Sequence, residues 1–177
     1  VTDVSLDVED GECLALVGHN GAGKTTLFKV ILGLIRATQG EVLIAGHAPG
    51  DRRNNLGFLP ENVVFQKNLT GVEILSFFAR LKGERREDVD ALLARVGLSD
   101  VGKKRIGAYS KGMRQRLGLA QTLIGNPDLL ILDEQTSGLD PGSRRSCSGL
   151  LDELRRAGTT ILPSSYVLSE IARYSTQ

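Results

Sequence analysis

The stretch Gly18-His-Asn-Gly-Ala-Gly-Lys24-Thr25-Thr26 decides how the rest of this 177-residue chain is interpreted. It follows the pattern G-x-x-x-x-G-K-T, which is typical of a loop that cradles the phosphates of a nucleoside triphosphate. Its glycines let the backbone wrap around an anion, so that several N–H groups point inward. Lys24 adds a positive charge for the β- and γ-phosphates, and the Thr25 hydroxyl is a ligand for Mg²⁺. The whole loop is therefore a candidate nucleotide-binding segment: Gly18, His19, Asn20, Gly21, Ala22, Gly23, Lys24, Thr25 and Thr26.

The flanking residues place this loop between a strand and a helix. Residues 13–17 form a short apolar run, as a buried parallel strand does. After the loop, apolar residues in the segment 24–34 recur at helical spacing on one face. The phosphates would thus lie at a helix N-terminus, where unpaired N–H groups attract anions. A glycine-rich surface turn would explain the loop alone, but not the strand and helix beside it.

Composition is that of an ordinary globular protein. Lysine and arginine number 22 and aspartate and glutamate 21, giving a net charge of +1, so charge offers no reason to expect nucleic acid as a partner. No apolar run approaches the ~18 residues that a membrane helix needs. Cys13 and Cys147 lack metal-ligand spacing and favour a cytoplasmic location over a disulfide. The chain does not begin with Met and shows no signal peptide, which indicates a trimmed piece of a longer protein.

Strand and helix patterns alternate along much of the chain. Strands are predicted at 4–8, 41–45, 56–60, 129–132 and 159–162, and a helix at 142–156. Residues 62–126 show helices and no good strand, beginning with a capping box in which Thr70 and Glu73 satisfy each other's N–H groups. Such alternation predicts an α/β fold with a parallel sheet covered on both faces.

A second signal is the pair Asp133-Glu134 at the end of the apolar strand 129–132. In an open parallel sheet, ligands gather at the carboxyl ends of the strands. Asp133 is expected to hold Mg²⁺, and Glu134 is placed to orient and polarise an attacking water. An apolar strand followed by a polar turn would look the same on its own, and the phosphate loop is what favours the functional interpretation.

A third signal is the segment that begins Tyr109-Ser110-Lys111-Gly112-Met113. Ser110 is a natural N-cap, and the apolar residues that follow fall on one helix face. A helix start with Ser, Lys and Gly at its mouth is a second anion site. A well-capped amphipathic helix explains everything except the Ser-x-Gly arrangement.

Together with Ser137-Gly-Leu-Asp140, these motifs resemble the nucleotide-binding domain of ATP-binding-cassette (ABC) proteins over essentially the whole chain. The resemblance implies the α/β fold of P-loop NTPases, with a mostly parallel core sheet, antiparallel β elements near the N-terminus and an inserted helical subdomain. It implies one ABC ATPase domain over 1–177, truncated at both ends. The nucleotide-binding core would comprise 1–61 and 127–177, and the helical subdomain 62–126.

The resemblance also implies ATP and Mg²⁺ as ligands and a head-to-tail dimer of two such domains. Each ATP would lie between the phosphate loop of one domain and the segment Ser110, Lys111, Gly112 and Met113 of the other. Asp140 would belong to the loop that couples the two sites. Glu61 stands where the family usually has a Gln that senses Mg²⁺ and the membrane partner, so it is a candidate catalytic and metal-site residue.

The function implied is an ATPase that powers a separate membrane permease from the cytoplasmic face of the cell membrane. The runs 56–62, 79–83 and 109–121 are similar to one branch, the ATPase for maturation of the copper enzyme nitrous oxide reductase. Alternatives are a soluble ABC-type regulator acting on ribosomes or DNA, although no heptad repeats are present, and a paralogue that binds ATP but hydrolyses it poorly. A kinase with the same phosphate loop would not need the Ser-Lys-Gly-Met helix start.

Three departures from the family pattern bear on hydrolysis. Tyr166 stands where the family usually has a His that contacts the γ-phosphate. Tyrosine keeps a hydroxyl donor but is longer and neutral. Pro163 falls at the expected end of an internal strand, where it removes a ladder hydrogen bond, and Gln135 replaces the usual Pro after the catalytic Glu. The sequence therefore predicts intact binding of Mg-ATP with slow turnover.

Overall fold

The computed structural model describes residues 3–51, 55–84, 88–135 and 139–165. Its sheet has four strands in the order β1-β4-β3-β2, and each neighbouring pair is parallel. The strands are β1 (Leu16–Val17), β2 (Leu56–Leu59), β3 (Leu129–Asp133) and β4 (Thr160–Ser165). The helices are α1 (Lys24–Ile31), α2 (Gly71–Lys82), α3 (Asp88–Arg95), α4 (Lys111–Thr122) and α5 (Pro141–Arg156), with short 3₁₀ turns at Ser99–Val101 and Ile106–Ala108.

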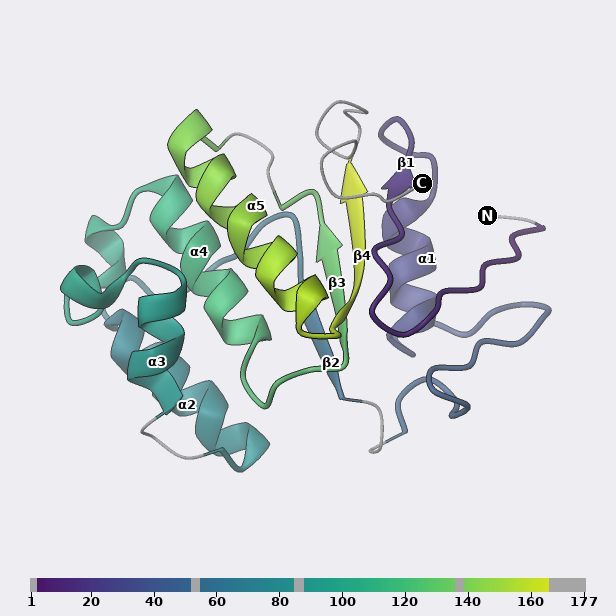
Figure 1. Ribbon diagram of the computed structural model, residues 1–177, viewed down its shortest axis with the longest axis horizontal. Coiled ribbons are helices and arrows are strands. Elements are labelled where there is room, and N and C mark those ends of the chain that lie inside the picture. The colour runs from purple at the N-terminus through teal and green to yellow at the C-terminus, as the bar shows by residue number, and fades with distance from the viewer. Residues whose placement is uncertain (1–2, 52–54, 85–87, 136–138, 166–177) are drawn as a thin grey trace.

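Helices cover both faces of this sheet. In Figure 1, α1 lies on one side of the strands and α2 to α5 lie on the other. Alternate residues of β3 divide between two apolar clusters, with Leu130 and Leu132 on the side of the larger group of helices and Ile131 against Phe28 of α1. Because both faces are buried, β3 is a continuous apolar run rather than an alternating one. The α/β fold with a parallel sheet is confirmed.

The capping box predicted at the start of α2 is present. Thr70 Oγ1 accepts from the Glu73 backbone N–H at 3.2 Å, and Glu73 Oε2 accepts from the Thr70 N–H at 2.8 Å. The helix ends at Gly83, which has a left-handed φ of 79°. Residues 62–84 and 88–126 contain α2, α3 and α4 and no strand, as expected for this part of the chain.

The strands predicted at 4–8 and 41–45, on either side of β1, are wrong. Residues 4–8 and 41–45 form no strand, and the only antiparallel pairing within 3–51 is one bridge between Ile44 and His47. Alternating hydrophobicity specifies the two faces of a strand but cannot supply the neighbour that completes its hydrogen bonds. Val4 and Leu43 remain 51% and 55% exposed, and the expected antiparallel elements reduce to this single bridge.

Pro163 lies inside β4 rather than at its end. The Ile161 N–H donates to the Glu12 carbonyl, and the Ile161 carbonyl accepts from the Leu14 N–H. Both bonds are therefore on the side of β4 that faces β1 and the residues just before it. Because these directions alternate along a strand, the missing N–H of Pro163 also faces β1, and the ladder between β3 and β4 is unbroken. The pairing with β1 consists of a bridge at Cys13 followed by Leu16–Val17, and the gap between them is opposite Pro163.

Candidate functional site

The loop predicted to bind phosphate joins the end of β1 to the start of α1. Gly21 and Gly23 have φ values of 85° and 94°, a left-handed conformation that other residues rarely adopt. No side chain caps α1 at Gly23, so the first N–H groups of the helix face the mouth of the loop without a side-chain acceptor. A helix start of this kind is an anion site.

Lys24 reaches back across this loop. Its Nζ donates to the Gly18 carbonyl at 2.5 Å and lies 3.4 Å from the His19 carbonyl. The same ammonium is 3.3 Å from Glu134 Oε1, with both side chains about nine-tenths buried. The positive charge is therefore held between the loop and the carboxylate at the end of β3, close to where phosphates would lie.

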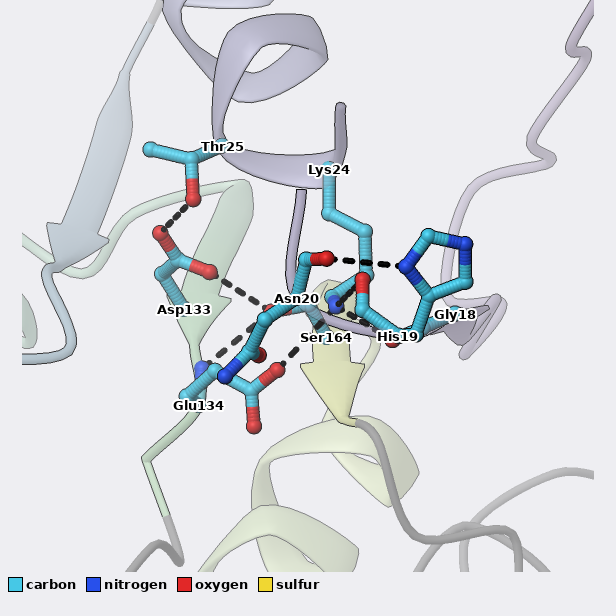
Figure 2. A network of polar contacts seen from close by, with 8 residues as sticks. All are labelled: Gly18, His19, Asn20, Lys24, Thr25, Asp133, Glu134 and Ser164. Carbon is cyan, nitrogen blue, oxygen red and sulfur yellow. Dashed lines mark hydrogen bonds and ion pairs between the residues drawn. The ribbon is translucent and has the colours of Figure 1, made fainter. Parts of the chain in front are cut away.

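A chain of hydrogen bonds connects the loop to the ends of β3 and β4, and Figure 2 shows how its members face one another. Thr25 Oγ1 donates to Asp133 Oδ2 at 2.7 Å. Ser164 Oγ donates to Asp133 Oδ1 at 2.7 Å and accepts from the Glu134 backbone N–H at 3.1 Å. Residues from α1, β3 and β4, far apart in the sequence, thus meet at the carboxyl edge of the sheet.

Glu134 has two unusual features. Its φ of 53° is left-handed, which is uncommon for a residue other than Gly, Asn or Asp. Its Oε1 is buried and accepts no hydrogen bond in the part of the chain that the structure describes, despite the nearby Lys24 charge. A buried carboxylate oxygen that accepts no hydrogen bond is rare, and it is a feature that catalytic residues share.

These residues fit a magnesium-bound nucleoside triphosphate. The loop N–H groups and Lys24 suit phosphate oxygens, and the Thr25 hydroxyl and Asp133 carboxylate are hard oxygen ligands. Among the described residues, no three His, Cys, Asp or Glu are grouped to hold a metal. Mg²⁺ needs no such group, because it is usually held by one or two carboxylates together with phosphates and water.

The segment Ser110–Met113 begins α4, as predicted. Ser110 Oγ accepts from the Met113 backbone N–H at 3.2 Å, while Lys111 is exposed. Gly112 is packed so closely that an added Cβ would come within 2.8 Å of Ser143 Oγ on α5. Figure 1 places α4, which this segment begins, and α1, which the phosphate loop begins, on opposite sides of the sheet.

Asp140 is the N-cap of α5. Its Oδ2 accepts from the Ser143 backbone N–H at 2.9 Å, and its Oδ1 accepts from the Ser143 hydroxyl at 2.7 Å. The bond from the Ser143 N–H, followed by that from its hydroxyl, holds the pKa of Asp140 below its ordinary value. Asp140 therefore lies beside Gly112, at the point where the starts of α4 and α5 meet.

The remaining predicted residues have separate positions. Glu61 is exposed and follows β2, whose Leu59 pairs with Leu132, so it lies at the same edge of the sheet as Asp133. Gln135 is buried, and its Oε1 accepts no hydrogen bond among the described residues. Tyr166 lies outside the described residues.

Sequence reasoning missed Ser164. Only the register of the sheet, in which Ser164 is opposite Asp133, reveals its role. A hydroxyl near the end of a buried apolar strand was the only available signal.

Comparison with known proteins identifies the family. Residues 1–137 match the family described as ABC transporter. The chain belongs to the ABC transporter ATP-binding family. It is 45% identical to an uncharacterized ABC transporter ATP-binding protein of Nostoc sp., over 96% of this chain and 53% of that protein. It is 36% identical to the ABC transporter ATP-binding protein NatA of Bacillus subtilis, over 97% of this chain and 73% of that protein.

A solved structure of the ATP binding subunit of an ABC transporter has the same fold. It superimposes with a TM-score of 0.86 at 31% identity, over 98% of this chain and 75% of that one. This ABC chain spans about half the length of the first curated relatives that it matches. In the described residues of this ABC chain, no helix is both long and apolar enough to span a bilayer.

Proposed function

We propose that this chain is the ATP-binding and ATP-hydrolysing subunit of a transporter whose permease is a separate membrane protein. The observation that carries the proposal is the connected group of Lys24, Thr25, Asp133 and Glu134 at one edge of the sheet. Membership of the ABC transporter family supports the same assignment. The chain would act on the cytoplasmic side, against the membrane.

Each side chain of this group has a role that follows from its position. Lys24 would bind the β- and γ-phosphates once it leaves the Gly18 carbonyl. Thr25 and Asp133 would hold Mg²⁺, which when bound neutralises charge on the phosphate oxygens. Glu134, whose Oε1 accepts no hydrogen bond among the described residues, would orient a water and take its proton. Glu61 would sense the metal from the end of β2.

We further propose that two ABC domains complete the site. The helix that this segment begins, α4, lies on the opposite side of the strands from α1 (Figure 1), so a second domain would bring Ser110 and Gly112 to the nucleotide. Their helix start carries the N–H groups and the hydroxyl that suit a γ-phosphate. Lys111 and Met113 would flank that contact, and Asp140, beside Gly112, would couple the paired sites.

Nucleotide binding tests the main proposal. Mg-ATP at a concentration of about 100 Kd is expected to raise the melting temperature by about 5–10 °C. Lys24→Ala should abolish this increase, because it removes the charge at the loop. Lys29→Ala is the matched control, since Lys29 is exposed on the same helix. The proposal fails if the parent shows no increase, or if both variants respond alike.

Hydrolysis tests the role of Tyr166. We propose that Tyr166, in place of the family's usual His, slows turnover while leaving binding intact. Tyr166→His is then expected to raise the steady-state ATPase rate by one to two decades, equivalent to about 1.4–2.8 kcal/mol of barrier. Equal and brisk rates in parent and variant would refute this.

A narrower proposal concerns the transported substrate. The assignment to nitrous oxide reductase maturation, and hence to copper, rests on the runs 56–62, 79–83 and 109–121 alone. None of the relatives named above carries that function in its name. A permease gene and copper-enzyme accessory genes beside the coding sequence would support it, and their absence from the locus would reject it.

A further inference from the structure

Ser164 connects the two acidic residues of the candidate site. It lies in β4 opposite Asp133 of β3 and is only 1% exposed. Two residues before them in their strands are Ile131 and Leu162, which pack against α1. Because residues two apart share a sheet face, Asp133 and Ser164 point toward the face that carries the phosphate loop.

The Ser164 hydroxyl makes two different hydrogen bonds. A serine hydroxyl has one proton to donate and lone pairs to accept with. Here the proton goes to Asp133 Oδ1 and a lone pair accepts the Glu134 backbone N–H. As Figure 2 shows, the hydroxyl lies between the two acidic residues and Thr25 lies beyond Asp133.

Each bond restricts one neighbour. With Oδ1 occupied by Ser164, the carboxylate presents Oδ2 to Thr25, the other candidate metal ligand. The second bond holds the N–H of Glu134 in its left-handed conformation, from which the side chain reaches Lys24. Without the hydroxyl, a buried carboxylate oxygen and a buried N–H would both lose their partner.

We propose that Ser164 is a positioning residue that orients Asp133 toward Mg²⁺ and Glu134 toward the attacking water. This rests on the proposed ATPase function and deepens it. Ser164 acts through the orientation of Asp133 and Glu134, as outer-shell hydrogen bonds do around other metal sites.

The same strand supplies a matched control. Thr160 is also buried, and its Oγ1 accepts the Gly11 backbone N–H at 2.9 Å. It lies at the other end of β4, next to the start of β3. Thr160→Val removes a buried hydroxyl from the same strand without touching Asp133 or Glu134.

The test compares Ser164→Ala, Ser164→Thr and Thr160→Val in the full chain. Binding of a fluorescent ATP analogue is measured with a Mg²⁺ titration and, separately, in EDTA. ATPase kcat and the melting temperature are recorded alongside. Ser164→Ala is expected to raise the half-saturating Mg²⁺ concentration and lower kcat by about 10- to 100-fold each. Its affinity for the analogue in EDTA should stay within about twofold of the parent, because the loop is untouched.

The controls separate positioning from packing. Ser164→Thr, which keeps a hydroxyl, should have a half-saturating Mg²⁺ concentration close to that of the parent. Thr160→Val should match the parent in both the Mg²⁺ titration and kcat. The inference is overturned if Ser164→Ala leaves the Mg²⁺ titration unchanged, or if it weakens binding in EDTA as much as in Mg²⁺. A parent that binds no Mg-ATP would instead overturn the proposed function, and this inference with it.

Discussion

Gly57 occupies a position where the backbone of β2 touches α4, and Gly57→Ala should destabilise the protein. A Cβ added there would lie 2.5 Å from the Thr122 carbonyl oxygen and 2.6 Å from Leu130 Cδ2. Leu130 can rotate, but the carbonyl belongs to the helix backbone and cannot move alone. Overpacking of this kind costs about 1–3 kcal/mol. In a domain of this size, that corresponds to a melting temperature lower by about 2–12 °C.

Gly149→Ala should have the opposite effect on stability from Gly57→Ala. Gly149 is exposed in α5, and an added Cβ would meet nothing within 4 Å. Alanine there should stabilise the helix by about 0.5–1 kcal/mol, because it replaces the most flexible residue. Thermal unfolding by circular dichroism on both variants gives the comparison. If Gly57→Ala melts at or above the parent temperature, the backbone of β2 does not pack this closely against Thr122 of α4.

Two further outcomes follow from ionisable groups. Asp140→Ala should lower the melting temperature at neutral pH because Ser143 loses its acceptor. Since the pKa of folded Asp140 lies below its ordinary value of 3.8, its stabilisation is full above that pH and is lost as pH falls further. An unchanged parent–variant difference in melts taken from about pH 5 to pH 3 would contradict this. Burial raises the pKa of Cys13 to about 11 and also raises that of Cys147. A thiol reagent at about pH 8 should thus react slowly with native protein and fully in denaturant, and fast native labelling would refute the burial of both thiols.

The parts of the fold that depend on residues close together in the sequence could be predicted. The strand, loop and helix around Lys24, the capping box at Thr70 and the N-cap at Ser110 depend on residues a few positions apart. The α/β class followed from the alternation of such elements. That Thr25 would share a task with Asp133 could also be expected, because parallel strands end at one edge.

The parts that depend on a distant partner could not be predicted. Residues 4–8 and 41–45 alternate as strands do, yet no neighbouring strand in the described chain completes their hydrogen bonds. Pro163 was expected to end its strand, but β4 continues because the missing donor faces the short β1 rather than β3. The importance of Ser164 lies in its register with Asp133, which no local sequence pattern encodes.

The two faces of the sheet bury apolar clusters of different size, and this difference should affect which part of the molecule opens most readily. Phe28 and Ile31 are the buried residues that α1 contributes, against Ile131 and Leu162, while the opposite face belongs to a far larger cluster. The eight-residue helix α1, which begins at the phosphate loop, thus packs against the smaller of the two apolar clusters. The backbone amides of α1 should exchange with deuterium well before those of β3. A bound nucleotide should slow this exchange, because it binds the folded helix start and stabilises it.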